Sequence, residues 1–168
     1  MPIALTHAHL INGDGRSFDD ATVVIAGGRI AKVATDAGSP SAEVTIDLEG
    51  RALMPGMIDL HVHMVGGDKA MGFGDEATTF KMSDSVIKAT LDGVEAARKT
   101  LHAGITTVRE IAARDYIDVY LKRAQATGQI TGPRMLATGP GVFMTGGHGS
   151  FLQPGHEADG VDAMVRRV

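Results

Sequence analysis

Residues 53–63 read Leu-Met-Pro-Gly-Met-Ile-Asp-Leu-His-Val-His, and this stretch decides the fold. The Pro-Gly pair marks a turn, and the apolar residues after it predict a strand that ends in two histidines. Because side chains alternate along a strand, His61 and His63 point to the same face. They come just before a loop at 64–74, at the carboxyl end of the strand, where α/β proteins build their active sites.

Two imidazoles one strand step apart can both bind one divalent ion, with Zn–N distances of about 2.0–2.1 Å. An ion held in this way activates water and polarises a carbonyl group. The spacing is a weak signal by itself, because a chain with 7 histidines produces such pairs by chance. His7 and His9 have the same spacing without a strand-to-helix context, and we interpret them as ordinary strand residues. Spacing alone leaves metal binding and a structural role equally open for His61 and His63.

Upstream of this stretch the sequence predicts only β structure. An Asn-Gly-Asp-Gly turn follows the first apolar run, and Gly27-Gly28 is typical of a two-residue hairpin. The expected strands cover 3–11, 22–26, 29–33 and 44–48. A sheet this small does not stand alone. We therefore assign residues 1–51 to an N-terminal β-rich segment and residues 52–168 to the start of a second domain.

Downstream the pattern changes to strands that alternate with helices, which predicts βαβ units and a parallel sheet. The expected elements are a helix between Ser83 and Gly104, a strand at 105–109, a helix at 116–127, a strand at 134–138 and a helix from 159 onward. The expected apolar face of the first helix is formed by Ile87, Leu91, Val94, Ala97 and Leu101. A glycine-rich loop at 139–160 follows the third strand. The chain stops inside the last helical pattern, which we interpret as truncation.

The composition excludes several classes of function. The formal charge of −4 argues against nucleic acid or an anionic membrane as the main partner. The absence of cysteine excludes disulfides, thiolate metal sites and a cysteine nucleophile, so any metal must be bound by other side chains. No apolar run approaches the roughly 18 residues of a membrane span, and the N-terminus does not resemble a secretory signal. A cytoplasmic location is the expectation.

Three further motifs follow in order along the chain. They are His-Ala-Gly-Ile-Thr-Thr-Val-Arg at 102–109, Gly-Pro-Arg at 132–134 and Thr-Gly-Gly-His-Gly at 145–149. Together with residues 53–63, they resemble the amidohydrolase superfamily, in the branch that contains imidazolonepropionase-like amidohydrolases and metal-dependent Xaa-Pro dipeptidases. The resemblance covers essentially the whole chain. The first motif points to the superfamily and the Thr-Gly-Gly-His-Gly loop to the dipeptidase branch.

The resemblance implies a strand-rich domain attached to a (β/α)8 barrel that binds one or two metal ions, Zn²⁺ or another divalent metal. His61 and His63 match two of the family's metal ligands. The other ligands, a carboxylated lysine, two histidines and an aspartate, have no counterpart here, so no catalytic residue is identified in this chain. Fewer than about 120 residues follow the β-rich segment, whereas a barrel needs about 250. The expected fold is therefore an incomplete α/β barrel of about three units.

The function implied by the resemblance is hydrolysis of amide or peptide C–N bonds by metal-activated water. Xaa-Pro dipeptides are the first substrate class and cyclic amides the second. The alternative is a non-catalytic fragment that binds metal and needs the missing part of the barrel. An incomplete barrel exposes sheet edges and apolar helix faces, which favours self-association into a homo-oligomer.

Three further residues are candidates for the site. His148, in the Thr-Gly-Gly-His-Gly loop, is expected from the resemblance to contact substrate; the alternative is an incidental histidine in a surface loop. Asp59 lies on the same face as His61 and either orients a ligand histidine or acts as a turn or cap partner. Arg109, with Glu110, forms either an ion pair near the site or a pair at its rim.

Overall fold

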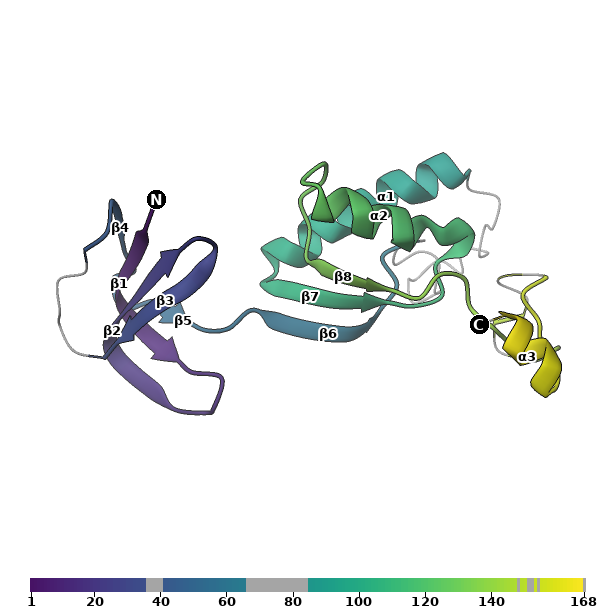
Figure 1. Ribbon diagram of the computed structural model, residues 1–168, viewed down its shortest axis with the longest axis horizontal. Coiled ribbons are helices and arrows are strands. Elements are labelled where there is room, and N and C mark those ends of the chain that lie inside the picture. The colour runs from purple at the N-terminus through teal and green to yellow at the C-terminus, as the bar shows by residue number, and fades with distance from the viewer. Residues whose placement is uncertain (36–40, 66–84, 148, 151–152, 154, 168) are drawn as a thin grey trace, which may run out of the picture. The chain divides into compact units, whose positions relative to one another are not determined.

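The computed structural model describes residues 1–35, 41–65, 85–147, 149–150, 153 and 155–167. The chain divides into two compact units, Met1–Pro55 and Gly56–Val168, each of which is described by itself (Figure 1). The assignment of domains to 1–51 and 52–168 stays a prediction. Within the described residues, no helix combines the length and the apolar character that a membrane crossing requires.

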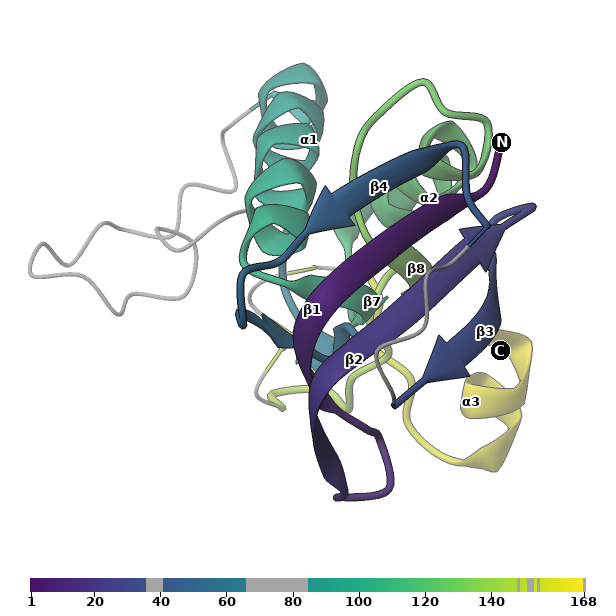
Figure 2. The same cartoon turned by 90° about the vertical axis from the view of Figure 1, so that its left-hand side faces the viewer.

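The first unit is a five-stranded sheet. Its strands are β1 (Ile3–Ile11), β2 (Ser17–Ala26), β3 (Arg29–Ala34), β4 (Val44–Asp47) and β5 (Ala52–Leu53). The order is β3-β2-β1-β4, and β5 also pairs with β1 (Figure 2). The two hairpin pairs are antiparallel, whereas β4 and β5 run parallel to β1. Gly27 and Gly28 both have positive φ, as a tight turn between β2 and β3 requires, which confirms the predicted hairpin.

The second unit is a parallel sheet covered by helices. Its elements are β6 (Met57–Val62), α1 (Val86–His102), β7 (Ile105–Glu110), the short 3₁₀ helix η1 (Arg114–Tyr116), α2 (Ile117–Ala126), β8 (Arg134–Ala137) and α3 (Val161–Arg167). The sheet order is β6-β7-β8, and both pairs are parallel. Figure 1 shows α1 and α2 on one face of this sheet. The predicted alternation of strands and helices is confirmed, and the fold is mixed α/β.

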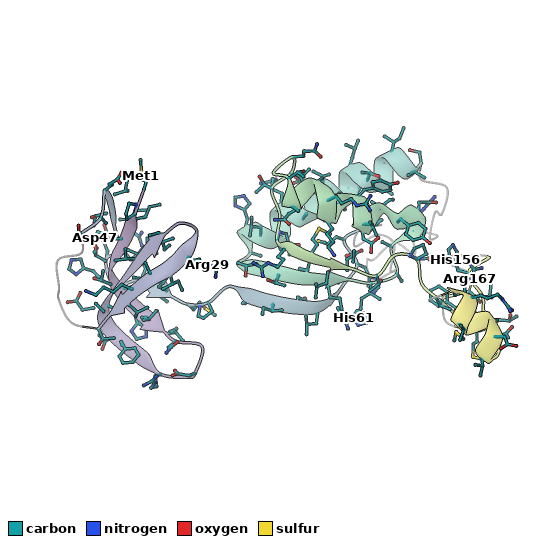
Figure 3. The ribbon with its side chains drawn as sticks, viewed as in Figure 1. Met1, Arg29, Asp47, His61, His156 and Arg167 are labelled. Carbon is teal, nitrogen blue, oxygen red and sulfur yellow. The ribbon has the colours of Figure 1, made fainter. Side chains whose placement is uncertain are left out.

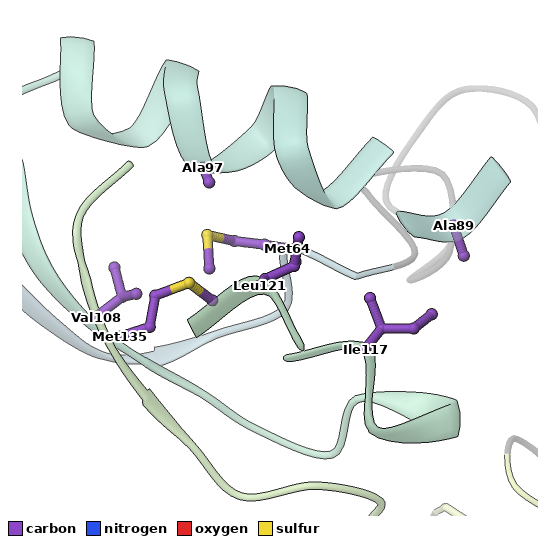
Figure 4. Close-up of a cluster of buried hydrophobic side chains, with 7 residues drawn as sticks. All are labelled: Met64, Ala89, Ala97, Val108, Ile117, Leu121 and Met135. Carbon is purple, nitrogen blue, oxygen red and sulfur yellow. The ribbon is translucent and has the colours of Figure 1, made fainter. Parts of the chain in front are cut away.

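The core of the second unit lies between the sheet and the two helices (Figure 4). Its buried side chains come from β7, β8, both helices and the segment after β6: Met64, Ala89, Ala97, Val108, Ile117, Leu121 and Met135. Val62 packs against the same cluster. This core fixes which face of β6 looks toward the helices, and thereby where the two histidines project.

The buried face of α1 agrees only in part with the one that the sequence predicts: Ala97 is buried and Val94 packs against the core. Ile87 and Leu91 are 74% and 64% exposed, so their assignment to the core was wrong. The buried positions are Ala89, Gly93 and Ala97, which follow one another at a spacing of four. A Cβ atom at Gly93 would lie 2.8 Å from Cδ1 of Leu121 in α2. Small residues therefore form the buried stripe because the two helices approach each other closely there.

The start of α1 also differs from the expectation. The helix is capped by Ser85, whose Oγ accepts a hydrogen bond from the backbone N–H of Lys88 at 3.2 Å. Ser83, the predicted cap, lies outside the described residues. At the other end, Gly104 has a φ of +87° and follows the helix as predicted.

Candidate metal centre

His61 and His63 stand at the carboxyl end of β6, on the face without helices. Val62 and Met64 pack into the core under α1 and α2, so the alternating residues His61 and His63 project from the opposite face. Figure 3 labels His61 on the side of the sheet away from both helices. The two imidazole ring centroids are 5.2 Å apart, at an interplanar angle of 76°. The side chain of His61 is exposed and that of His63 is half-buried. The structure therefore brings the predicted pair together.

The ring of His63 is oriented by the strand next to it. Its Nδ1 atom lies 3.0 Å from the backbone carbonyl oxygen of Ile111, directly after β7. A carbonyl oxygen only accepts hydrogen bonds, so Nδ1 carries the proton. In the neutral ring this leaves the lone pair on Nε2. This is the arrangement that protein metal sites use to fix the tautomer and direction of a ligand histidine.

Asp59 contacts the backbone of its neighbour. Its Oδ1 atom accepts a hydrogen bond from the backbone N–H of His61 at 3.0 Å. This contact agrees with the alternative from the sequence, in which Asp59 bonds to nearby backbone as a turn partner. The role of Asp59 toward an imidazole ring stays a prediction.

Arg109 lies on the histidine face of the sheet. Val62 of β6 pairs with Glu110 of β7, and both turn toward the core, so Arg109 turns the other way. Its Nε atom donates a hydrogen bond to the carbonyl oxygen of Leu60 at 2.7 Å. Arg109 therefore braces β6 just before His61. Because Arg109 and Glu110 point to opposite faces, the sheet does not bring their side chains together as a pair.

Glu110 is a site residue whose contacts sequence reasoning missed. Its side chain is fully buried. Its Oε2 atom accepts a hydrogen bond from the N–H of Met64 at 2.8 Å, and its Oε1 atom accepts one from the N–H of Val65 at 3.2 Å. Burial raises the pKa of the Glu110 carboxyl to about 7. The two backbone hydrogen bonds lower this pKa, but their effect is smaller than that of burial. The available signal was the strand period of two, which places Glu110 on the same face as the buried Val108.

The raised pKa of Glu110 predicts how stability changes with pH. Between pH 4.5 and about 7 the folded protein binds a proton at Glu110 that the unfolded chain has released. The contribution of Glu110 to the free energy of unfolding therefore falls as the pH rises, by at most about 1.4 kcal/mol per pH unit. Urea unfolding of the wild type and of Glu110→Gln at pH 5 and pH 7 measures it. A wild type that gained stability relative to the variant over this window would contradict the prediction.

A second buried carboxylate ties β8 to α2. Asp118 is fully buried. Its Oδ2 atom accepts hydrogen bonds from the N–H groups of Thr138 at 2.9 Å and Gly139 at 2.8 Å. The Thr138 hydroxyl oxygen in turn accepts a hydrogen bond from the N–H of Ala112 at 3.1 Å. Side-chain hydrogen bonds thus join the carboxyl ends of β7 and β8, at the edge of the sheet where His61 and His63 lie.

The glycine-rich loop after β8 is fastened to the end of β7. The Gln153 side chain donates a hydrogen bond to the carbonyl oxygen of Ala112 and accepts one from the N–H of Gly141. A Cβ atom at Gly141 or at Gly149 would collide with the ring of Phe143, so the ring packs where these two glycines have no side chain. His148 lies outside the described residues, and its role stays a prediction.

His7 and His9 show what the same spacing gives in a different setting. The Nδ1 atom of His7 lies 2.7 Å from Oδ1 of Asp20, and that of His9 lies 2.7 Å from Oδ1 of Asp19. The hydrogen bond to Asp20, with the charges of Asp47 and Asp20, raises the pKa of His7. Each of these rings is paired with its own aspartate.

The family follows from comparison with known proteins. The model of the amidohydrolase family matches residues 52–165, which begin just before β6 and end within α3. This chain belongs to the amidohydrolase family. The motifs around His61 and His63 indicated this family.

Individual amidohydrolases resemble the chain over different lengths. An imidazolonepropionase from Micrococcus luteus is 39% identical over 64 residues, which are 38% of this chain and 16% of that protein. A solved amidohydrolase matches with a TM-score of 0.80 and 26% identity, over 99% of this chain and 43% of that one. A prolidase solved in complex with N-methylphosphonate-L-proline matches with a TM-score of 0.78 and 27% identity, over 98% and 42%. The chain spans less than half the length of these relatives.

The residues present fit part of a divalent metal site of the kind that amidohydrolases generally bind. Imidazole nitrogen suits zinc and other transition metals, and His63 presents an unprotonated Nε2 atom next to the ring of His61. The described residues contain no group of three or more His, Cys, Asp or Glu side chains that could hold a metal. This part of the amidohydrolase chain therefore supplies two candidate ligands.

Proposed function

We propose that this chain is part of a metal-dependent hydrolase that cleaves amide or peptide C–N bonds with metal-activated water. The observation that carries the proposal is the geometry at the end of β6. There His63 keeps Nε2 free because Nδ1 is bonded to the carbonyl of Ile111, and His61 stands beside it. The amidohydrolase family supports the hydrolytic reaction.

In this proposal each residue of the site has a defined task. His61 and His63 bind Zn²⁺ or another divalent ion through ring nitrogens. The bound ion supplies a Lewis acid that lowers the pKa of water and polarises the carbonyl that is attacked. Arg109 holds the backbone of β6 at Leu60, directly before the first ligand. Asp59 holds the N–H of His61, which limits rotation of the same peptide unit.

The sheet β6-β7-β8 and its helices correspond, in this proposal, to about the first three units of a (β/α)8 barrel. A histidine pair at the carboxyl end of the first parallel strand fits that architecture, because barrel enzymes place their active sites at this end. The remaining ligands then come from strands beyond the three described here, in the rest of a barrel.

The substrate class that we favour is a dipeptide with proline at its carboxyl end. The support is the likeness to the prolidase solved with N-methylphosphonate-L-proline, at a TM-score of 0.78. His148 is the proposed contact to substrate, because its loop is fastened by Gln153 to the end of β7, at the edge where the metal ligands lie. A cyclic amide is the second candidate, and it is favoured by the 39% identity to an imidazolonepropionase.

The proposal is tested by hydrolysis with the 168-residue chain in the presence of Zn²⁺. Cleavage of Xaa-Pro dipeptides and of matched Xaa-Ala dipeptides is followed by amine release, and ring opening of a hydantoin by chromatography of its N-carbamoyl product. We expect slow cleavage that prefers Xaa-Pro and disappears in the double variant His61→Ala, His63→Ala. The reaction is slow because two ligands alone hold the ion weakly.

The other outcomes separate the alternatives. Cleavage of the hydantoin in preference to the dipeptides would assign the cyclic-amide class. A folded chain that binds Zn²⁺ and hydrolyses none of the panel would contradict catalysis by this chain and support the non-catalytic metal-binding alternative.

A further inference from the structure

Glu110 binds the two peptide groups that follow His63. β6 ends at Val62, and the last backbone bond of its ladder runs from the N–H of Ile111 to the carbonyl oxygen of Val62 at 3.1 Å. Beyond that point the N–H groups of Met64 and Val65 bond to the two carboxylate oxygens of Glu110 instead. After His63, the buried side chain of Glu110 therefore accepts the backbone hydrogen bonds that a neighbouring strand would otherwise accept.

His63 is consequently held from both sides by the end of β7. The ladder bond fixes the peptide group before it, the carboxylate of Glu110 fixes the peptide groups after it, and the carbonyl of Ile111 fixes its ring. The direction of a side chain follows from the backbone on both sides of its Cα atom and from its own rotamer. Each of these three constraints on His63 is set by two consecutive residues, Glu110 and Ile111.

We propose that Glu110 is a positioning residue for the metal ligand His63, a role that rests on the proposed function. Its carboxylate holds the backbone after His63, so that the Nε2 atom keeps its direction toward the ion. Burial of a carboxylate costs free energy unless its hydrogen bonds are made. A side chain that served only to fill the core would be apolar, like its strand neighbour Val108. The acid is therefore explained by the two N–H groups it binds.

A matched comparison separates positioning from general stability. Glu110→Gln keeps the shape of the side chain but offers one acceptor oxygen and turns an NH₂ group toward the other N–H. Asp118→Asn makes the same chemical change at another fully buried acid among the described residues, which accepts hydrogen bonds from Thr138 and Gly139 at the end of β8 and from Val119. Both variants lose stability. Only the first changes the backbone next to a proposed metal ligand.

The experiment measures Zn²⁺ affinity of the full chain by calorimetry at pH 8 for the wild type and both variants. We expect Glu110→Gln to lower the affinity about tenfold or more, the range found for partners that orient metal ligands. We expect Asp118→Asn to stay within about twofold of the wild type. An unchanged affinity in Glu110→Gln, or an equal loss in both variants, would overturn the positioning role while leaving the proposed function intact.

A second measurement uses the wild type alone and does not require the variant to fold. If the hydrogen bonds from Met64 and Val65 to Glu110 strengthen metal binding, then metal binding must strengthen these hydrogen bonds by the same factor. Zn²⁺ is therefore expected to slow hydrogen exchange of the Met64 and Val65 amides, with little change at Thr138 and Gly139. Equal slowing at all four amides, or no slowing at the first two, would contradict the role of Glu110.

If the wild type binds no Zn²⁺, the proposed function fails. The inference that Glu110 orients His63 is then tested by the tautomer of the His63 ring in the absence of metal. Nitrogen-15 NMR of the histidines then reports the tautomer of His63. We expect a predominant Nδ1–H form in the wild type and a mixture of tautomers in Glu110→Gln. The same tautomer ratio in both proteins would overturn the inference.

Discussion

The double variant His61→Ala, His63→Ala is expected to lower Zn²⁺ affinity at least about 100-fold. Loss of a partner that only orients a ligand costs about 10- to 100-fold in affinity, and this variant removes both ligands themselves. The fold should survive, because His61 is exposed and His63 half-buried, so no core volume is lost. Calorimetric titration at pH 8 measures the affinity, and circular dichroism checks the fold.

The first unit provides the matched control for this prediction. His7→Ala, His9→Ala removes a second pair with the same spacing. In that pair the two Nδ1 atoms are bonded to different aspartates, Asp20 and Asp19. We expect its Zn²⁺ affinity to match the wild type. Equal losses in the two double variants would mean that the chain binds zinc through scattered surface histidines.

Replacement of Asp118 by alanine is expected to destabilise the second unit by about 3 kcal/mol. The carboxylate accepts hydrogen bonds from the N–H groups of Thr138, Gly139 and Val119. A buried donor left without a partner costs about 1–3 kcal/mol, and the Gly139 bond is itself buried. Urea unfolding followed by fluorescence of the two tyrosines, both in this unit, measures the change.

An exposed aspartate on the neighbouring helix is the control for this loss. Asp92 pairs with Lys88 one turn away on α1, and both side chains are substantially exposed. Exposed pairs of this kind contribute about 0.3–0.5 kcal/mol. Asp92→Ala should therefore change the free energy of unfolding very little. An Asp118→Ala loss within about 1 kcal/mol of the Asp92→Ala value would show that the buried network does not stabilise the unit.

The sequence predicts the local features of this fold well. The apolar run after Pro55-Gly56 predicted the strand β6, and the period of two placed His61 and His63 on one face. Gly27-Gly28 and Gly104 marked a hairpin and a helix end, because positive φ is a local requirement that glycine meets. Each of these features depends on neighbours within a few residues, which is the range that a single sequence encodes directly.

The features that the sequence did not reveal depend on contacts between distant segments. Glu110 bonds to residues 46 and 45 positions earlier, and nothing in the local pattern names those partners. The network of Asp118 likewise reaches across to the end of β8. In a single strand pattern, a buried acid looks the same as a polar residue at the rim. Only the packed sheet shows that its partners are backbone N–H groups.

The prediction of the buried face of α1 was partly wrong for a different reason. Large apolar residues usually mark the buried side of a helix, and Ile87 and Leu91 fit that pattern. The structure buries the predicted Ala97 together with Ala89 and Gly93, because small side chains let α1 lie close to Leu121 of α2. The distance between two packed helices determines which side chains fit between them. The sequence of one helix does not give this distance.

The central claim is that His61 and His63 bind one divalent ion at the end of β6. Anomalous diffraction at the zinc absorption edge, from crystals of this chain grown with Zn²⁺, tests it most directly. The account predicts a peak about 2.0–2.1 Å from a ring nitrogen of both histidines, on Nε2 in the case of His63. Zinc peaks elsewhere with none between these two rings, for example at His7 and His9, would contradict it.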